Sequence, residues 1–311
     1  MNITAVVVTY NRKALLQREI ESLRHQKLLS AIIVVNNGST DGTAEWLATQ
    51  HDLTVINQDN VGGSGGFYTG IQRAFDNGAE WIWCMDDDVF PHDNCLDALV
   101  KVVREYPDTL KDTEPHHPLG IVAPHRLLEG ETFTHEFQHF NFTNPFASVH
   151  GSRLKPHSIT TTDNYPIVGC DFEGPFIHRS VVEKIGLPNK ELFIFCDDTE
   201  YCLRAHQAGF ALLYAGGALM DKHKFFSNDN WTTRNQKKKW KRYYQVRNEA
   251  FLNHHYGQNW GVRYLRSWIG VIGYILPAVI TMPFTRAWQP KDLSMLWQAY
   301  SDGIHERLGK R

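Results

Sequence analysis

The chain of 311 residues contains only five cysteines, and they form no paired motif. No Cys-x-x-Cys spacing indicates a zinc or redox site, and an odd number argues against a disulfide framework. This usage is typical of reduced thiols in a cytosolic protein, packed as small hydrophobic residues. The five are Cys84, Cys95, Cys170, Cys196 and Cys202.

An excess of one charge and a long uninterrupted apolar run are also lacking. There are 32 Lys and Arg against 34 Asp and Glu, so nothing indicates a general nucleic-acid partner. The N-terminal segment has no charged region or cleavage site of a signal peptide, and we therefore expect no secretion. Residues 268–284 form a 17-residue apolar run, which Pro277 and Pro283 interrupt. That is short for a membrane-spanning helix, and a buried or interfacial helix is the preferred interpretation.

Strand-like and helix-like segments alternate through the first hundred residues. Runs rich in β-branched or aromatic residues predict strands, and the segments between them have helical spacing or helix-start residues. Strands are predicted at 3–8, 31–35, 53–56 and 81–89, with helices at 14–26, after 43, at 62–77 and from 92. This alternation predicts βαβ units around a mainly parallel sheet.

A glycine cluster opens the third predicted helix, at residues 62–66. It lacks the Lys-Ser/Thr ending of a P-loop and does not fit the GxGxxG pattern. One interpretation is a flexible turn before a helix. The other is a helix start at which a diphosphate approaches free backbone N–H groups. The cluster alone does not decide between them.

Three consecutive carboxylates, Asp86, Asp87 and Asp88, end the fourth predicted strand. Like charges this close raise each other's pKa unless a cation compensates, which indicates a divalent metal with bound phosphates. The alternative is a solvated turn with acids at a helix start. Because open α/β sheets bind ligands at the carboxyl ends of their strands, three acids at this position favour a site.

A second acid cluster follows the apolar run 192–195. The helix macrodipole favours acids at a helix start, and pairing with Arg204 four residues later accounts for Glu200. Asp197 and Asp198 are less well explained in this way, because they directly follow an aromatic segment. Both are therefore candidate site residues.

The rest of the chain is less regular. We predict a surface loop at 107–118, strands at 119–123 and 211–214, a short helix at 180–185, and an irregular insertion over the site at 125–166. Surface or loop positions are predicted for His116, His117, His125, His135 and His139, which have no fixed metal-ligand spacing. A basic helix is predicted from about residue 235. Its basic residues form either a solvated face or a contact with anionic lipid, and they are Lys237, Lys238, Lys239, Lys241 and Arg242.

Four motifs, in this order, resemble those of the inverting family-2 nucleotide-sugar glycosyltransferases of the GT-A fold. They are Thr9-Tyr10-Asn11-Arg12, the segment 37–43, the DxD-type Asp86-Asp87-Asp88, and 197–200 with Arg204. The resemblance covers roughly residues 3 to 255. The segments 60–67 and 81–88, with Arg247-Asn248, look most like the galactofuranosyltransferase and rhamnosyltransferase branch, with galactofuranosyl transfer the closer match.

The resemblance implies a Rossmann-like α/β fold, with a mixed, mainly parallel sheet flanked by helices. Residues 1–225 would form the GT-A catalytic domain, with a nucleotide-binding half at about 1–105 and an acceptor half at about 106–225. Residues 226–311 would form a C-terminal helical region.

It also implies roles for individual residues. Asp198 would be the general base and Asp197 would contact a sugar, while Asp88 and His223 would bind Mn²⁺ or Mg²⁺. Asp86 would face the nucleotide ribose. The implied nucleotide-sugar-binding set is Thr9, Tyr10, Asn11, Arg12, Asn37, Asp41, Asn60, Gly63, Gly65, Asp86, Asp87 and Glu173. Many relatives have an acid that reads the pyrimidine where this chain has Asn36-Asn37, which leaves the base preference open.

The implied function is transfer of galactofuranose from UDP-galactofuranose to a glycan or lipid-linked glycan in bacterial cell-surface polysaccharide synthesis. The site would be cytoplasmic, at the inner face of the cell membrane. A dTDP-rhamnose-dependent rhamnosyltransferase, a nucleotidyltransferase and a non-catalytic sugar-binding scaffold are the alternatives. Carboxylates at Asp86, Asp88 and Asp198 favour an enzyme. The sequence does not name the acceptor, the linkage or the number of sugars added.

Overall fold

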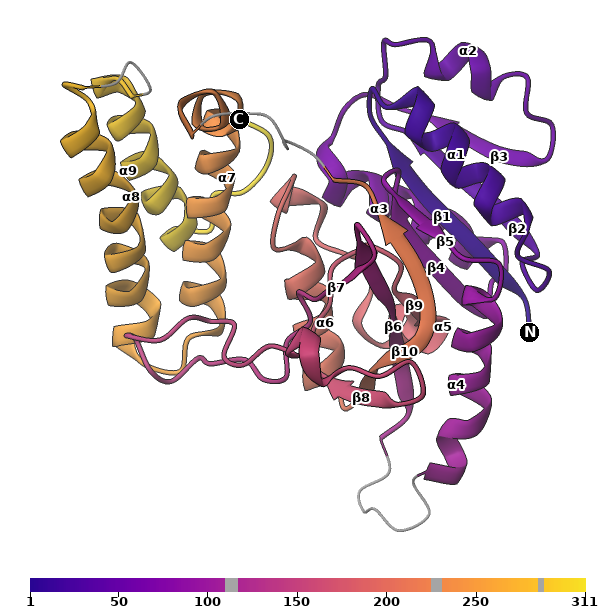
Figure 1. The fold of residues 1–311 in the computed structure, drawn as a ribbon. Helices are drawn as coiled ribbons and strands as arrows, with labels where there is room; N and C mark the ends of the chain where they lie inside the picture. Colours follow the sequence, from indigo (N-terminus) through magenta and orange to yellow (C-terminus); the bar gives the residue numbers. More distant parts are fainter. Residues whose placement is uncertain (110–116, 225–230, 285–287) are drawn as a thin grey trace. The chain divides into compact units, whose positions relative to one another are not determined.

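The computed structural model describes residues 1–109, 117–224, 231–284 and 288–311 (Figure 1). Side chains at 107–109 and 231–238 are outside this description, as is most of the predicted loop at 107–118 with His116. The side chains of Lys237 and Lys238 therefore lie outside the described residues. The chain divides into two units. The first comprises 1–139, 152–190 and 198–223, and the second 140–151, 191–197 and 224–311.

Among the described residues, ten strands form one sheet in the first unit. The order is β3 (Leu53–Asn57), β2 (Ala31–Asn36), β1 (Ile3–Thr9), β4 (Trp81–Asp86), β9 (Phe176–His178), β6 (Leu119–Leu128), β10 (Ala211–Lys222) and β5 (Val89–Pro91), with β7 (Glu131–Phe133) on β6 and β8 (Asn164–Ile167) on β10. The first four strands are parallel, as are β6 and β10, and β9 is antiparallel to both of its neighbours. The predicted α/β sheet is confirmed, with mixed strand directions.

The register of the parallel strands aligns their carboxyl ends. Thr9 lies beside Asn36, which lies beside Asn57, and Asp86 lies beside Val8. The chain moves outward from β1 to β2 and β3 and then returns to the other side of β1 as β4. The sheet therefore changes direction between β1 and β4, where open α/β sheets bind ligands.

Helices cover both faces of the sheet because side chains alternate along the strands. On one face, Ile3, Ala5 and Val7 of β1 join a core with α1 (Lys13–Arg24), α2 (Thr43–Leu47) and α4 (Cys95–Thr109). On the other face, Val6 and Val8 join a core with α3 (Gly62–Asp76), α5 (Arg179–Ile185) and α6 (Asp197–Gln207).

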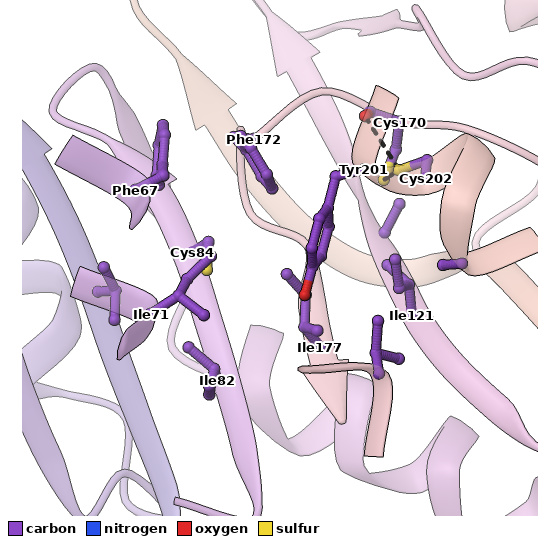
Figure 2. Close-up of a cluster of buried hydrophobic side chains, with 14 of the residues drawn as sticks. Phe67, Ile71, Ile82, Cys84, Ile121, Cys170, Phe172, Ile177, Tyr201 and Cys202 are labelled. Atoms are coloured by element: carbon purple, nitrogen blue, oxygen red, sulfur yellow. Dashed lines mark hydrogen bonds between the residues drawn. The ribbon is translucent and has the colours of Figure 1, made fainter. Parts of the chain in front are cut away.

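Aromatic side chains fill part of the second core. Figure 2 shows three aromatic side chains beside the strand residues Ile82 and Ile177. They are Phe67 of α3, Tyr201 of α6, and Phe172 of the segment before β9. The ring centroids of Phe67 and Phe172 are 4.6 Å apart, and those of Phe172 and Tyr201 are 6.0 Å apart. This packing joins α3 and α6 through the segment that precedes β9.

Two glycines let α3 lie close to β1. A Cβ atom on Gly66 would be 2.4 Å from Val8 Cγ1, and one on Gly70 would be 2.3 Å from Val6 Cγ1. Both distances are far shorter than van der Waals contact, so part of the glycine cluster serves helix–strand packing.

The second unit is helical. It contains α7 (Trp231–Tyr256), the π-helical segment η3 (Gly261–Arg266), α8 (Ser267–Thr281) and α9 (Pro290–Ile304). A core that includes Tyr243, Val271 and Leu296 joins α7, α8 and α9. Residues 261–281 are long and apolar enough to cross a membrane, and 22% of the most apolar window is buried. Two 3₁₀ turns, η1 (Pro156–Ser158) and η2 (Lys190–Leu192), complete the elements.

Several predicted segments differ from the structure. The strand predicted at 119–123 continues as β6 through Pro124 to Leu128, so His125 is buried rather than on a surface loop. Its ring nitrogens contact Gly216 O at 2.8 Å and Thr132 Oγ1 at 3.0 Å, and these hydrogen bonds compensate for the loss of water around the buried ring. The predicted strand 81–89 is two strands separated by Asp87 and Asp88, and α4 begins at Cys95.

Candidate active site

Asp86, Asp88 and Glu173 come together at the carboxyl edge of β4. One carboxylate oxygen from each lies within 4.8 Å of those of the other two. Oxygen ligands of this kind are those that Mg²⁺, Mn²⁺ and Ca²⁺ prefer. The sequence pointed to Glu173 as a residue of the sugar-binding set. The structure brings its carboxylate to the two acids of the DxD motif.

Backbone contacts to β4 hold Glu173 in place. Gly174 N donates to Cys84 O at 2.8 Å, and Cys84 N donates to Pro175 O at 2.9 Å. The indole N–H of Trp83 donates to Gly174 O at 2.9 Å. Gly174 has a φ of +103° and a Cβ there would be 2.6 Å from Pro124 Cγ, so only glycine fits this turn.

The three clustered carboxylates repel one another, and one of their oxygens lacks a hydrogen-bond donor within the described part of the chain. Burial, and then the charges of Asp88 and Glu173, raise the pKa of Asp86 well above its ordinary value. Asp88 Oδ1 is buried and accepts no hydrogen bond within the described part of the chain. An acid held at raised pKa beside an oxygen without a donor fits a site for a hard divalent cation.

Asp87 has a different task, because its side chain points into the protein and is only 2% exposed. It accepts hydrogen bonds from Thr9 Oγ1 at 2.7 Å, Tyr10 N at 3.3 Å and Arg12 Nη1 at 2.9 Å. Arg12 also contacts Asp88 Oδ2 at 3.3 Å. Asp87 thus fixes the loop after β1 beside the DxD acids, and its contact with a nucleotide stays a prediction.

Two cations in this region were not expected from the sequence. Lys222 forms an ion pair with Glu173, and its Nζ lies 3.6 Å from Asp88 Oδ1. Burial opposes the charge on Lys222, but the charges of Glu173 and Asp88 outweigh it and raise its pKa. The residue lies at the end of β10, which runs eight residues beyond the predicted strand. A longer strand prediction would have placed it at this edge.

Arg126 is the second unexpected cation and is 1% exposed. Its guanidinium donates to Glu136 Oε1 at 2.6 Å, to Asp171 Oδ2 at 2.8 Å and to Glu173. Burial opposes ionisation of Asp171, but the charge of Arg126 and the contact with His135 lower the pKa of Asp171. The buried guanidinium of Arg126 therefore orients the carboxylate of Glu173.

Negative charge exceeds positive charge around this edge of the sheet. Among the described residues, six acids lie in the ion-pair networks of Arg12, Arg126 and Lys222 or beside them, against these three cations. The acids are Asp86, Asp87, Asp88, Glu136, Asp171 and Glu173. A bound divalent cation would offset part of this excess.

The segment 36–43 is joined to the loop after β1. Asn11 has a left-handed φ of 54°, and its Oδ1 accepts from Thr40 N at 2.6 Å. Asp41 accepts from Lys13 N at 3.0 Å and from Thr43 N at 3.2 Å, so it binds the first residues of both α1 and α2. An open hollow of about 380 Å³ is lined by Asn11, Arg12 and Asp41, among others.

The amide of Asn37 is used within the protein. Its Nδ2 donates to Gly62 O at 2.9 Å, and its Oδ1 accepts from Gln58 Nε2 at 3.0 Å and Val61 N at 3.2 Å. Asn60 Oδ1 accepts from Gly62 N at 2.9 Å. These bonds shape the entry to α3. Recognition of a pyrimidine by Asn37 stays a prediction.

The two predicted site glycines differ in their surroundings. A Cβ on Gly63 would meet no atom within 4 Å, so this position is open to a ligand. A Cβ on Gly65 would be 2.5 Å from Val61 Cγ2, so Gly65 is needed for packing of the loop.

Asp197 and Asp198 begin α6, as predicted, and Glu200 pairs with Arg204 at 2.7 Å. Asp198 Oδ1 accepts from Thr199 N at 2.5 Å, whereas Asp197 is buried. His223 is tied to the acid motif through its backbone, because its N–H donates to Asp88 O at 2.8 Å. Among the described residues, the group of carboxylates does not include the His223 ring, and its role as a metal ligand stays a prediction.

Comparison with known proteins identifies relatives of this chain. The chain is 26% identical over 217 residues to galactofuranosyltransferase GlfT1 of Mycolicibacterium smegmatis, which covers 67% of this chain and 66% of that protein. It is 26% identical over 279 residues to galactofuranosyltransferase GlfT2 of the same organism, covering 81% of this chain and 40% of that protein. The matched regions thus span just under two thirds of the first relative and two fifths of the second.

Solved structures share the fold at low sequence identity. GalNAc-T7, solved with UDP, GalNAc and Mn²⁺, has a TM-score of 0.58 at 14% identity, covering 98% of this chain and 56% of that chain. S. aureus TarS 1–349 has a TM-score of 0.53 at 13% identity, covering 98% and 83%. These are GT-A glycosyltransferases, and the likeness confirms the predicted fold. The Glycosyl transferase family 2 model matches residues 4–186, and the chain belongs to this family.

Proposed function

We propose that the chain is a metal-dependent inverting galactofuranosyltransferase that uses UDP-galactofuranose. The carboxylates of Asp86, Asp88 and Glu173, gathered at the switch point between β1 and β4, support this most directly. The similarity to GlfT1 and GlfT2 supports galactofuranose as the sugar. A glycan or lipid-linked glycan of the bacterial cell surface is the proposed acceptor.

Each residue has a task in a single displacement. Asp88, Glu173 and His223 would hold Mn²⁺ or Mg²⁺, which when bound offsets the charge that grows on the departing nucleoside diphosphate. Asp86 would contact the ribose. Asp198 accepts the proton of the acceptor hydroxyl as that oxygen attacks the sugar, and Asp197 hydrogen-bonds a sugar hydroxyl.

We also propose peripheral attachment to the cytoplasmic face of the membrane through the second unit. Exposed apolar side chains recur on α8 at spacings of seven and four residues, at Ile269 (40% exposed), Leu276 (56%) and Ile280 (59%). Residues 224–311 contain fifteen Lys and Arg against five Asp and Glu. An exposed apolar face on a helix, within a segment that has an excess of Lys and Arg, supports binding at an anionic lipid surface.

Turnover of a panel of nucleotide sugars tests the donor and the reaction. We expect UDP-galactofuranose to be used in preference to UDP-galactopyranose and dTDP-rhamnose, with activity abolished by chelation and restored by Mn²⁺. Asp88→Ala should be inactive, whereas Asp93→Ala, a matched control at a 90% exposed side chain, should retain activity. Preference for dTDP-rhamnose would identify a rhamnosyltransferase. Binding of UDP without turnover of any donor would support a non-catalytic scaffold.

Vesicle flotation tests the membrane contact. The full-length protein should float with anionic vesicles at low salt, and Ile280→Asp should reduce this binding. Failure to float with anionic vesicles under these conditions would contradict the attachment.

A further inference from the structure

Three residues without the freedom of glycine have left-handed backbone conformations immediately before the proposed base. Phe193, Phe195 and Cys196 have φ values of 66°, 70° and 62°. Residues with a Cβ rarely adopt this region, and such conformations persist only where the surroundings enforce them. The segment that contains them, 191–197, belongs to the second unit. Its last residue is followed directly by Asp198.

Asn248 of α7 supplies hydrogen bonds to this segment. Its side chain is fully buried. Its Nδ2 donates to the carbonyl oxygens of Leu192 at 3.0 Å, Ile194 at 2.9 Å and Phe195 at 2.9 Å. One primary amide has two N–H groups, so three acceptors within this range use its whole donor capacity. The bonds span the two Phe residues with left-handed φ.

Arg247 holds both the same segment and Asn248. Its Nε donates to Asn248 Oδ1 at 2.8 Å, which fixes the orientation of the Asn248 amide. Its Nη2 donates to Leu192 O at 2.8 Å and to Glu191 O at 3.2 Å. Arg247 is 1% exposed, so its guanidinium is committed to these carbonyls rather than to solvent.

A ring contact completes the support. Phe193 stacks on Tyr244 of α7, with centroids 4.8 Å apart and an angle of 25° between the rings. The side chain of one strained residue is therefore held by the same helix that binds the backbone on either side of it. Each contact is made within the second unit.

We propose that Arg247 and Asn248 are positioning residues for the reaction, which enforce the left-handed segment and thereby set where the chain delivers Asp198 at the start of α6. This inference rests on the proposed role of Asp198 as general base. Proton transfer requires the base within hydrogen-bond reach of the acceptor hydroxyl, and a displacement of about 1 Å can lower turnover about 100-fold. Neither residue contacts substrate in this proposal.

Asn248→Ala is the primary test, and Asn253→Ala is its matched control. Asn253 is also a buried amide on α7, but it donates to Ser267 Oγ at 3.1 Å, away from the strained segment. We expect Asn248→Ala to lower kcat about 10- to 100-fold, with the donor KM and the affinity for UDP with Mn²⁺ near the parental values. Asn253→Ala should keep kcat near the parental value if the variant is folded.

A second substitution separates positioning from loss of stability. Cys196→Gly makes one left-handed φ accessible without strain, because glycine adopts it readily. In the Asn248→Ala background it should recover part of the lost kcat, although glycine adds no contact. If Asn248→Ala does not fold, Asn248→Ser, which retains one donor, takes its place with the same expected rescue.

The outcomes distinguish this inference from the proposed function. Asp198→Asn is measured in parallel. If it retains turnover, Asp198 is not the base and the proposed function is wrong at that residue. If it loses turnover while folded Asn248→Ala keeps parental kcat, the positioning role is refuted. Equal losses of kcat in Asn248→Ala and Asn253→Ala, or no rescue by Cys196→Gly, would also refute it.

Discussion

We expect Lys222 to compete with a metal ion for the carboxylates of Asp88 and Glu173, so that its removal tightens Mn²⁺ binding. Its ammonium pairs with Glu173 and lies 3.6 Å from Asp88 Oδ1, so it occupies the electrostatic position that a cation would use. Substitution by Met keeps the length and apolar stem of the side chain and removes the charge. The carboxylates of Asp88 and Glu173 would then lack this counter-ion in the absence of metal.

The size of the effect follows from the geometry. At 3.6 Å and an effective dielectric constant of about 20, one pair of unit charges attracts by about 4 to 5 kcal/mol. The side chain of Lys222 is 15% exposed, so solvent screens this attraction only in part. Desolvation of the ammonium offsets much of it. A remaining difference of about 1.4 to 2.8 kcal/mol corresponds to about 10- to 100-fold in affinity.

Mn²⁺ binding to the nucleotide-free protein is measured by titration calorimetry or from the spin-resonance signal of free Mn²⁺. Lys222→Met should bind Mn²⁺ about 10- to 100-fold more tightly than the parent protein. Lys184→Met, at an exposed lysine of α5, is the control and should bind as the parent does. Equal or weaker Mn²⁺ binding in Lys222→Met would refute the competition between the lysine and the metal.

Further predictions concern packing, pH and catalysis. Gly70→Ala should destabilise the fold by about 1 to 3 kcal/mol in denaturant titration, because its Cβ would meet Val6 Cγ1 at 2.3 Å; unchanged stability would show that α3 can shift. Burial, and then the nearby aspartates, raise the pKa of Glu19, so the folded state holds a proton that the unfolded state has lost. Stability should therefore fall as pH rises from the ordinary value of about 4.5 toward the raised pKa, by up to about 1.4 kcal/mol per pH unit. Glu19→Gln should remove this slope, and a slope that persists would assign it to another group. Asp198→Asn should lose about 100-fold or more in kcat, whereas Asp197→Asn should mainly raise KM; parental turnover in Asp198→Asn would assign the base elsewhere, first to Asp197.

Much of the first unit was predictable because local patterns and the final contacts agree. The strand at 31–35 is β-branched and buried from Ile32 onward and is paired on both sides, so its hydrophobic run and its environment both favour a strand. Asp86 to Asp88 were recognisable because three charges end an apolar strand. Alternation of strands with helices predicts that the first four strands are parallel, as they are.

Long-range pairing explains what the sequence did not show. Arg126 and Lys222 lie on strands that extend beyond their apolar runs, and each is stabilised by acids distant in sequence, Asp171 and Glu173. A strand predicted from its apolar residues stops at the first charged residue. In the folded sheet the strand continues, because each charged side chain pairs with an acid. The left-handed segment before Asp197 was hidden for a similar reason, since Asn248 enforces it from more than fifty residues away.

Binding of UDP with and without Mn²⁺, measured by calorimetry on the parent protein and on Asp88→Asn and Glu173→Gln, tests the site most directly. UDP should bind tightly to the parent only when Mn²⁺ is present, and both variants should lose most of this metal-dependent gain while still folding. If UDP binds the parent equally well in chelator, or if both variants keep the full gain, the carboxylates of Asp86, Asp88 and Glu173 do not form the cation-dependent nucleotide-sugar site.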